Sequence, residues 1–206
     1  MDLGQERASM GGNKVTRIRQ SLLSAWQWSV RHKRGYEDFL LTLQGKSIPA
    51  NPMMQNGIKF EELVRLAIKG VAIPADHEWY KAIIATSKIL RGSAEQVYKT
   101  APITVNDRQY LLSGTADNIK AGVIYDTKFS VTYKYGKYFD SPQHPAYFYL
   151  WPDAKAFQYL IFNGKELFRE TYYPFAVKPI ADYIADFQKY LDMNNLTEIY
   201  ETHWRI

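Results

Sequence analysis

The spacing of the apolar residues changes once along the chain, and this change limits how the chain can fold. From Ser21 to Leu90, apolar residues recur mainly three or four positions apart, which indicates helices with one buried face. From Glu95 onward, β-branched and aromatic residues become frequent, which indicates strands. A helical region followed by strands predicts a domain of the α/β class.

Three helical regions are expected before the change of spacing. The first lies on both sides of the basic residues between Arg31 and Arg34, and the third has Asp76 as its candidate N-cap. A segment rich in proline and asparagine is expected to form the loop between the first two regions. The expected ranges are Ser21–Leu43 for one or two helices, Ser47–Gln55 for the loop, Asn56–Lys69 for the second region and Asp76–Leu90 for the third.

Two turn signals divide the first strand-rich region. Asn106-Asp107 separates Glu95–Val105 from Tyr110–Lys128, and Ala121-Gly122 divides the latter segment. Because Asn, Asp and Gly favour tight turns, the region is expected to form two or three strands of a meander.

A hairpin and a final helix are expected in the last third of the chain. Asn163-Gly164 is the strongest hairpin signal, because this pair favours the two-residue turns that join antiparallel strands. The hairpin would pair Ala156–Phe162 with Leu167–Tyr173, and Pro179 would then open a helix from a first-turn position. The order of elements therefore predicts a mixed central β-sheet flanked by α-helices.

Length and charge set limits on organisation and partners. The chain has 206 residues, which predicts a single domain over residues 15–206 after a flexible tail over residues 1–14. Lysine and arginine outnumber aspartate and glutamate by 26 to 21, which gives a formal net charge of +5. This balance favours a polyanionic partner.

The absence of cysteine excludes a branch of chemistry. Without thiols the chain has no disulfide, thiolate zinc site, iron–sulfur cluster or thiol nucleophile. The sequence also has no signal-peptide pattern and no stretch of about 18 apolar residues. We therefore expect a cytoplasmic protein that has no membrane partner.

Two aspartates on neighbouring predicted strands form the sharpest chemical feature. Asp117 ends the run Ser113-Gly114-Thr115-Ala116-Asp117, and Asp126 follows on the next strand. Magnesium takes hard oxygen ligands, so both carboxylates and the carbonyl of Thr127 would form half of a metal shell. Lys128 is expected on the same face as Asp126, because side chains two apart on a strand share a face. Its ammonium would orient or help deprotonate a water and offset charge on phosphate.

A plainer interpretation of the same residues is open. Asp117-Asn118 would begin a turn, and Asp126 and Lys128 would form an ordinary ion pair on a solvated strand face. However, Asp126 follows the apolar run Val123-Ile124-Tyr125, and an unpaired carboxylate at the end of a buried strand would be costly. A compensating group is therefore expected beside it.

Four short motifs occur in the order that is typical of one nuclease superfamily. They are Gly57-Ile58-Lys59-Phe60-Glu61, Gly114-Thr115-Ala116-Asp117, Asp126-Thr127-Lys128 and Gln143-His144-Pro145-Ala146-Tyr147. With these motifs and the helix start Arg19–Trp26, the chain resembles the PD-(D/E)XK nuclease superfamily. The resemblance is to its RecB-like and phage-exonuclease-like branch, in the form without an iron–sulfur cluster.

The resemblance implies a restriction-endonuclease-like core and a metal-dependent DNA nuclease that hydrolyses phosphodiester bonds, specifically an exonuclease in recombination or repair. Asp117, Asp126 and Lys128 would be catalytic, with Lys128 beside the attacking water. Glu61, Asp117, Asp126 and Thr127 would hold Mg²⁺ or Mn²⁺. DNA would be the substrate, and a second copy of the chain or a recombination protein would be a partner. The alternative is a non-catalytic nucleic-acid-binding protein that keeps the nuclease fold.

Some implied roles have ordinary structural alternatives. Glu61 would supply a further carboxylate, or it would pair with Arg65 one helical turn away. Gln143 and Tyr147 would contact the DNA strand or brace the site, or they would be a satisfied amide and a core tyrosine. Pro145 lies between them and is tolerated only in the first turn of a helix.

Basic and aromatic residues alternate within Tyr133–Phe139. Lys134, Tyr135 and Lys137 are expected to bind nucleic acid, because aromatic rings stack on bases while lysines neutralise phosphates. A chain with 16 tyrosines would also produce such a run by packing alone. The sequence leaves both interpretations open.

Overall fold

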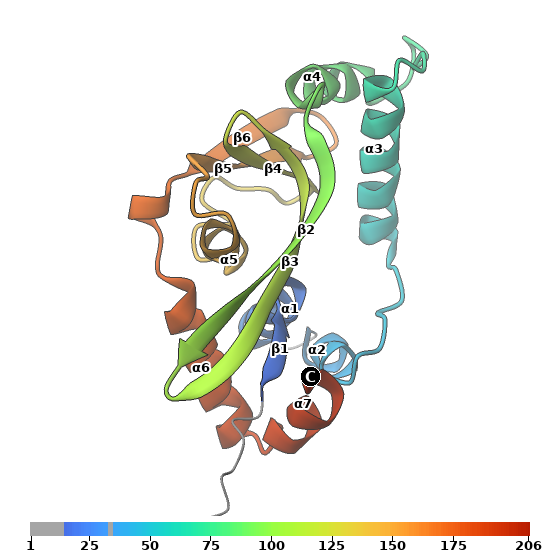
Figure 1. Cartoon of the computed structure of the whole chain (residues 1–206). Coiled ribbons are helices and arrows are strands. Elements are labelled where there is room, and N and C mark those ends of the chain that lie inside the picture. Colours follow the sequence, from blue (N-terminus) through green and yellow to red (C-terminus); the bar gives the residue numbers. More distant parts are fainter. Residues whose placement is uncertain (1–14, 33–34) are drawn as a thin grey trace, which may run out of the picture.

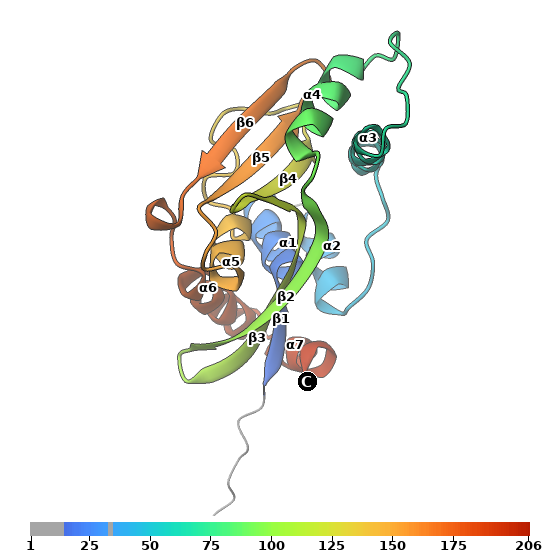
Figure 2. The ribbon, with the colours of Figure 1, turned by 45° about the horizontal axis from the view of Figure 1, so that its top comes forward.

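The computed structural model of the chain describes residues 15–32 and 35–206, so the tail expected over residues 1–14 lies outside the described part. A mixed six-stranded sheet lies at the centre, and helices pack against it (Figures 1 and 2). The predicted α/β class with a mixed central sheet is therefore confirmed. No helix in these ranges is both long and apolar enough to span a membrane.

The strands form one sheet in the order β1-β3-β4-β5-β6, with β2 paired to β3 outside this path. β1 pairs with β3 in parallel, as β4 does with β5, and the other pairs are antiparallel. The strands are β1 (Thr16–Arg19), β2 (Ala94–Val105), β3 (Arg108–Lys120), β4 (Val123–Phe129), β5 (Ala156–Phe162) and β6 (Leu167–Tyr172).

Helices cover both faces of the sheet. Along β5, Phe157, Tyr159 and Ile161 join a large core with α1, α5 and α6, whereas Leu160 and Phe162 join a smaller core under α3 and α4. Because side chains alternate along a strand, the two cores lie on opposite faces. The helices are α1 (Gln20–Arg31), α2 (Gly35–Leu43), α3 (Pro52–Ile68), α4 (Tyr80–Leu90), α5 (Gln143–Leu150), α6 (Ile180–Met193) and α7 (Thr197–Trp204), with a 3₁₀ turn η1 (Pro174–Ala176).

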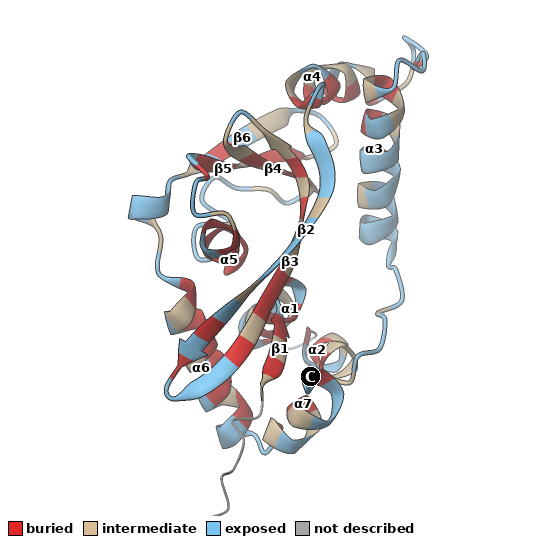
Figure 3. Cartoon of the chain, in the orientation of Figure 1, coloured by how far each residue is buried: buried red, intermediate tan, exposed pale blue. Residues whose placement is uncertain are grey.

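Burial follows this arrangement. α3 exposes most of its length and buries only one stripe, whereas α5 is buried nearly all round (Figure 3). α5 lies between the sheet and the helices α1 and α6, so it has almost no face toward solvent. The segment that carries the Gln143–Tyr147 motif is therefore a central element of the fold.

Two expected helix boundaries are wrong. α3 begins at Pro52, inside the expected loop Ser47–Gln55, because Asn51 caps it by accepting a hydrogen bond from the amide of Met54 at 3.0 Å. The expected N-cap Asp76 does not open α4. Residues 75–79 form turns in which Nδ1 of His77 accepts from the amide of Trp79, and the helix starts only at Tyr80.

The expected turns are confirmed. Asn106, Asp107, Ala121 and Gly122 all have positive φ, as tight antiparallel turns require, and β2, β3 and β4 form the meander. Asn163-Gly164 joins β5 to β6, as predicted. Three short elements were not predicted, namely β1, η1 and α7.

Candidate active site

The candidate site lies in a gap along one edge of β3. β2 occupies the other edge of this long strand over nearly its whole length. On the site edge, β1 pairs with residues 110–113 and β4 pairs with residues 118–120, so no strand pairs with residues 114–117 within the described chain. This stretch, which lacks a partner only on the site edge, is the Gly114–Asp117 motif. Asp126 lies just beyond the last β4 residue that pairs with β3, so both aspartates flank the gap.

Asp126 is a buried carboxylate held from two sides. Its side chain is 4% exposed, and its Oδ2 lies 2.7 Å from Nζ of Lys128. Its Oδ1 accepts a hydrogen bond from Nε2 of Gln143 at 2.5 Å, and Oε1 of Gln143 in turn accepts from the hydroxyl of Tyr159 at 3.2 Å. The expected shared face of Asp126 and Lys128 and the expected compensating group are therefore present.

Asp117 lies within β3 and does not begin a turn, which contradicts the plainer interpretation of Asp117-Asn118. Its Oδ1 accepts a hydrogen bond from Nε2 of Gln96 at 3.2 Å. Burial is the main cause that raises the pKa of Asp117, to about 7, and the charges of Asp126 and Glu61 add to it while Lys128 opposes it. The carboxylate is therefore costly to ionise without a further cation nearby.

The pKa of Lys128 is set by opposing effects. Burial alone would lower it, but the nearby carboxylates of Asp126 and Asp117 raise it above its ordinary value. A lysine with a raised pKa keeps its proton near neutral pH. Lys128 is therefore an ammonium at the edge of the gap, with its Nζ 2.7 Å from Oδ2 of Asp126.

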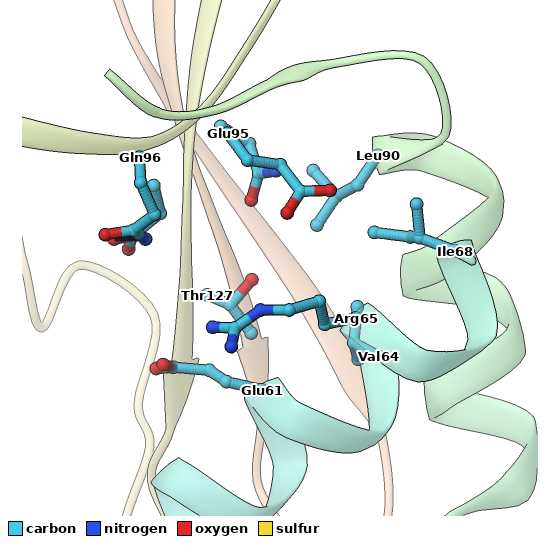
Figure 4. A pocket seen from close by; sticks show the side chains of 10 residues that line it. Glu61, Val64, Arg65, Ile68, Leu90, Glu95, Gln96 and Thr127 are labelled. Atoms are coloured by element: carbon cyan, nitrogen blue, oxygen red, sulfur yellow. Dashed lines mark hydrogen bonds between the residues drawn. The ribbon is translucent and has the colours of Figure 1, made fainter.

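Glu61 approaches the site from α3. Figure 4 shows Glu61 and Arg65 extending from that helix toward the strands that carry Thr127 and Gln96. These four residues and Asp117 line one recess. Loss of hydration raises the pKa of Glu61, while Lys128 lowers it, Asp126 raises it and Arg65 lowers it. Glu61 is exposed, and no ion pair joins it to Arg65 in the described ranges.

The metal-binding capacity of these residues depends on the ion. Across residues 15–32 and 35–206, no three carboxylate or imidazole side chains are grouped closely enough to hold a metal ion by themselves. Magnesium usually takes one or two carboxylates and completes its shell with water and substrate phosphate, so a pair of carboxylates suffices for it. Oδ2 of Asp126 is buried and receives no hydrogen bond of normal geometry, despite the nearby Lys128 ammonium. This oxygen fits the role of a metal ligand.

Gln143 and Tyr147 make internal contacts. Both are buried on α5, where Gln143 binds Asp126 and the Tyr147 hydroxyl donates to the carbonyl of Thr115 at 2.5 Å. That carbonyl lies in the stretch of β3 that has no strand partner on the site edge. The Tyr147 hydroxyl therefore supplies the hydrogen bond that a neighbouring strand would otherwise supply. Pro145 is the third residue of α5 and lies in its first turn, as its chemistry requires. A contact of either residue with DNA stays a prediction.

Gly114 makes the approach of α5 to β3 possible. A Cβ at this position would lie 2.6 Å from Cε1 of Tyr147 and 3.1 Å from Cδ1 of Leu150. We expect Gly114→Ala to lower the free energy of unfolding by about 1–3 kcal/mol, because the added methyl overpacks this contact. Urea unfolding of Gly114→Ala beside Gly45→Ala, whose Cβ would meet nothing within 4 Å but whose φ is positive, separates crowding from backbone strain. Wild-type stability of Gly114→Ala would contradict the close packing.

Some residues of the expected nucleic-acid-binding tract pack inside the protein, and others are exposed to solvent. Tyr133 donates its hydroxyl to the buried carboxylate of Glu170 at 2.6 Å, and Tyr138 stacks on Tyr159. Lys134 and Tyr135 are exposed, with Tyr135 exposed by 87%. Packing therefore accounts for Tyr133 and Tyr138, whereas nucleic-acid binding by Lys134, Tyr135 and Lys137 stays a prediction. Lys137 and Lys128 both line a second cleft.

Comparison with known proteins supports the fold class. The chain superposes on the crystal structure of SSO0001 with a TM-score of 0.54 at 12% sequence identity, and the match covers 86% of this chain and 76% of that one. At this identity the likeness shows the fold alone. No family model and no curated protein matches the chain.

Sequence reasoning missed Gln96. Gln96 contacts Asp117 and has a φ of 50° within a strand. A left-handed residue other than glycine is strained, and such strain is often found at functional sites. The sequence gives no signal of this conformation, because Gln96 stands in an ordinary strand pattern.

We expect Asp117→Asn to stabilise the metal-free protein above about pH 7. The pKa of Asp117 in the folded state, about 7, exceeds its ordinary value of 3.8. The folded state therefore holds the proton more tightly than the unfolded chain, and the free energy of unfolding falls as pH rises from about 4 to 7. Asparagine has no charge and removes this loss, so the gain is on the order of 1–3 kcal/mol above about pH 7.

Urea unfolding of wild type and Asp117→Asn in chelator, at pH values from about 4.5 to 8, checks this expectation. Burial lowers the pKa of His144 to about 4, so His144 contributes the opposite slope below its ordinary pKa of 6.5. That contribution cancels in the difference between the two proteins. If the difference in the free energy of unfolding between Asp117→Asn and wild type did not grow with pH, ionisation of Asp117 would not destabilise the folded protein.

Proposed function

We propose that this chain is a metal-dependent DNA nuclease with a restriction-endonuclease-like core, and that it acts as an exonuclease in recombination or repair. The observation that carries the proposal is the buried carboxylate of Asp126, held by Lys128 and Gln143 and flanking the same gap as Asp117. Burying a carboxylate in an ion pair is seldom more stabilising than placing apolar residues of similar size there, so chemistry is the better reason for its presence.

Asp117, Asp126 and the carbonyl of Thr127 would hold Mg²⁺ or Mn²⁺, with Glu61 as a further carboxylate at the rim. Such an ion, when bound, supplies a Lewis acid for the phosphate and lowers the pKa of a bound water. The buried Oδ2 of Asp126, without a normal hydrogen bond, supports this assignment. The raised pKa of Asp117 supports it too, because a nearby cation would restore the ionised form.

Lys128 acts as a cation in this proposal. Because the carboxylates of Asp126 and Asp117 raise its pKa, Lys128 is an ammonium in the metal-free protein. It therefore orients the attacking water or offsets the negative charge that develops on the phosphate oxygens. Gln143 fixes the other oxygen of Asp126 and so keeps the carboxylate turned toward Lys128.

Contact with DNA is assigned to the exposed part of the basic and aromatic tract. Lys134 and Tyr135 are free of the packing that occupies Tyr133, and Lys137 lines the same cleft as Lys128. Lysines at these positions would neutralise phosphates, and the Tyr135 ring would stack on a base. A second copy of the chain, or a recombination protein, stays part of the proposal.

The test is incubation of the protein with end-labelled linear DNA and closed circular DNA, each single- and double-stranded, with magnesium or with chelator. We expect magnesium-dependent degradation of linear molecules and no attack on closed circles. Degradation that persists in chelator would contradict the metal dependence. Binding of DNA without cleavage in any metal would favour the alternative of a non-catalytic nucleic-acid-binding protein.

A further inference from the structure

A second cleft opens beside the candidate active site. Its volume is about 380 Å³, and it lies between α1 and the loop of residues 130–141. Lys128 and Gln143, which hold Asp126, also line this cleft. Whatever occupies the cleft therefore lies next to the proposed reaction centre.

An aromatic platform forms part of the wall on α1. Trp28 is 49% exposed and stacks on His32, with ring centroids 3.6 Å apart and an angle of 22° between the planes. Gly35 lets the indole pack closely against the first residue of α2, since a Cβ there would lie 2.5 Å from Cδ1 of Trp28. Packing of the core does not require a half-exposed tryptophan, so the fixed ring is available to a ligand.

The same cleft carries three basic side chains. Lys128 lies at the Asp126 side, Arg31 lies on α1 and Lys137 comes from the loop. Nζ of Lys137 donates to Oγ of Ser130 at 2.6 Å, and Arg31 contacts the Asp140 carboxylate at 3.2 Å. These contacts fix Arg31 on α1, the same wall as the aromatic platform, and Lys137 on the loop that faces it.

We propose that this cleft binds one unpaired nucleotide of the substrate strand, with its base on the Trp28–His32 platform and its phosphate near Arg31, Lys137 and Lys128. Stacking on aromatic rings with phosphate neutralisation by cations is how single strands are held without sequence preference. The volume is at the lower end of the roughly 300–1,000 Å³ of small-ligand sites, which suits a single nucleotide and not a base-paired stack. The inference rests on the proposed function and narrows its substrate to single-stranded or frayed DNA.

The test measures binding separately from cleavage. A single-stranded oligonucleotide with 2-aminopurine at its terminal position is titrated with the full chain in chelator, and a blunt duplex serves as the comparison. We expect quenching of the 2-aminopurine and tighter binding of the single strand than of the duplex. Trp28→Ala should weaken single-strand binding by about 5–150-fold, which corresponds to about 1–3 kcal/mol for one stacked base, and should abolish the quenching.

Matched variants keep the result interpretable. Trp28→Phe keeps an aromatic face and should recover much of the affinity, while His32→Ala should weaken binding without removing the exposed ring. Phe175→Ala removes another exposed aromatic ring, 88% exposed and outside the cleft, and should leave binding unchanged. Circular dichroism and thermal unfolding verify that each variant is folded.

The outcomes separate this inference from the proposed function. Equal quenching and affinity in Trp28→Ala and wild type, or no preference of wild type for single strands, would overturn the cleft assignment even if the protein cleaves DNA. If Trp28-dependent quenching occurs but no metal supports cleavage, the cleft assignment stands and the nuclease proposal fails.

Discussion

Asp126→Asn is expected to reduce DNA cleavage by roughly 10³-fold or more, which is the scale of loss when one member of a cooperating catalytic unit is removed. Asparagine is nearly the same shape, so its Oδ1 can still accept the hydrogen bond from Gln143. The charge that would hold the metal ion is lost, however, and so is the ion pair with Lys128. DNA binding should persist, because phosphate contacts elsewhere supply most of the affinity.

A matched control and a double variant sharpen this prediction. Asp153→Asn removes one negative charge at an exposed position and should cleave DNA at the wild-type rate. The double variant Asp117→Asn with Asp126→Asn should be hardly slower than the worse single variant, because a site that has lost its metal gains little from its second ligand. Cleavage rates on the DNA that wild type degrades provide the measurement. A wild-type rate in Asp126→Asn would remove the carboxylate from the mechanism.

The local parts of this site were predictable from sequence. Alternation along a strand places Asp126 and Lys128 on one face, and the 2.7 Å distance between them confirms it. The turn at Ala121-Gly122 brings Asp117 and Asp126 to neighbouring strands. Both inferences depend on residues that are close in sequence, where backbone geometry leaves few alternatives.

The gap that contains these residues was not predictable in the same way. It exists because β1 pairs in parallel with residues 110–113 of the β3 edge and β4 pairs with residues 118–120, which leaves the residues between them without a partner on that edge. β1 has four residues, too few for a reliable strand pattern, and its partner lies about 90 positions further along the chain. Pairing at such sequence distance is decided by the packing of the whole domain, which short-range patterns do not encode.

The packing of α5 shows the same limit. The motif spacing suggests that Gln143 and Tyr147 share a helix face, but each side chain does a different task, one at Asp126 and one at the Thr115 carbonyl. Tyr159, which donates to Gln143, comes from a strand that no motif marks. These contacts depend on how α5 crosses β3, and that crossing depends on the absence of a side chain at Gly114.

Lys128→Met is expected to separate electrostatic assistance from metal binding. Methionine keeps an unbranched chain of similar length but has no charge, so cleavage should fall by about 10²–10⁴-fold as stabilisation of the phosphate charge is lost. Without metal, Asp126 becomes a buried carboxylate without its ion-pair partner, and the free energy of unfolding should fall by about 1–3 kcal/mol. Magnesium should restore this stability, because the ion would replace the missing cation beside Asp126.

Three measurements test this expectation together: the cleavage rate, calorimetric titration with magnesium, and urea unfolding with and without the ion. Lys165→Met removes an exposed lysine at the β5–β6 turn and should match wild type in all three. Because the ammonium and the metal compete for the same carboxylate, Lys128→Met should bind magnesium at least as tightly as wild type. A parallel loss of magnesium affinity and cleavage would instead make Lys128 a structural support of the site. Unchanged cleavage would show that the ion pair with Asp126 has no part in the reaction.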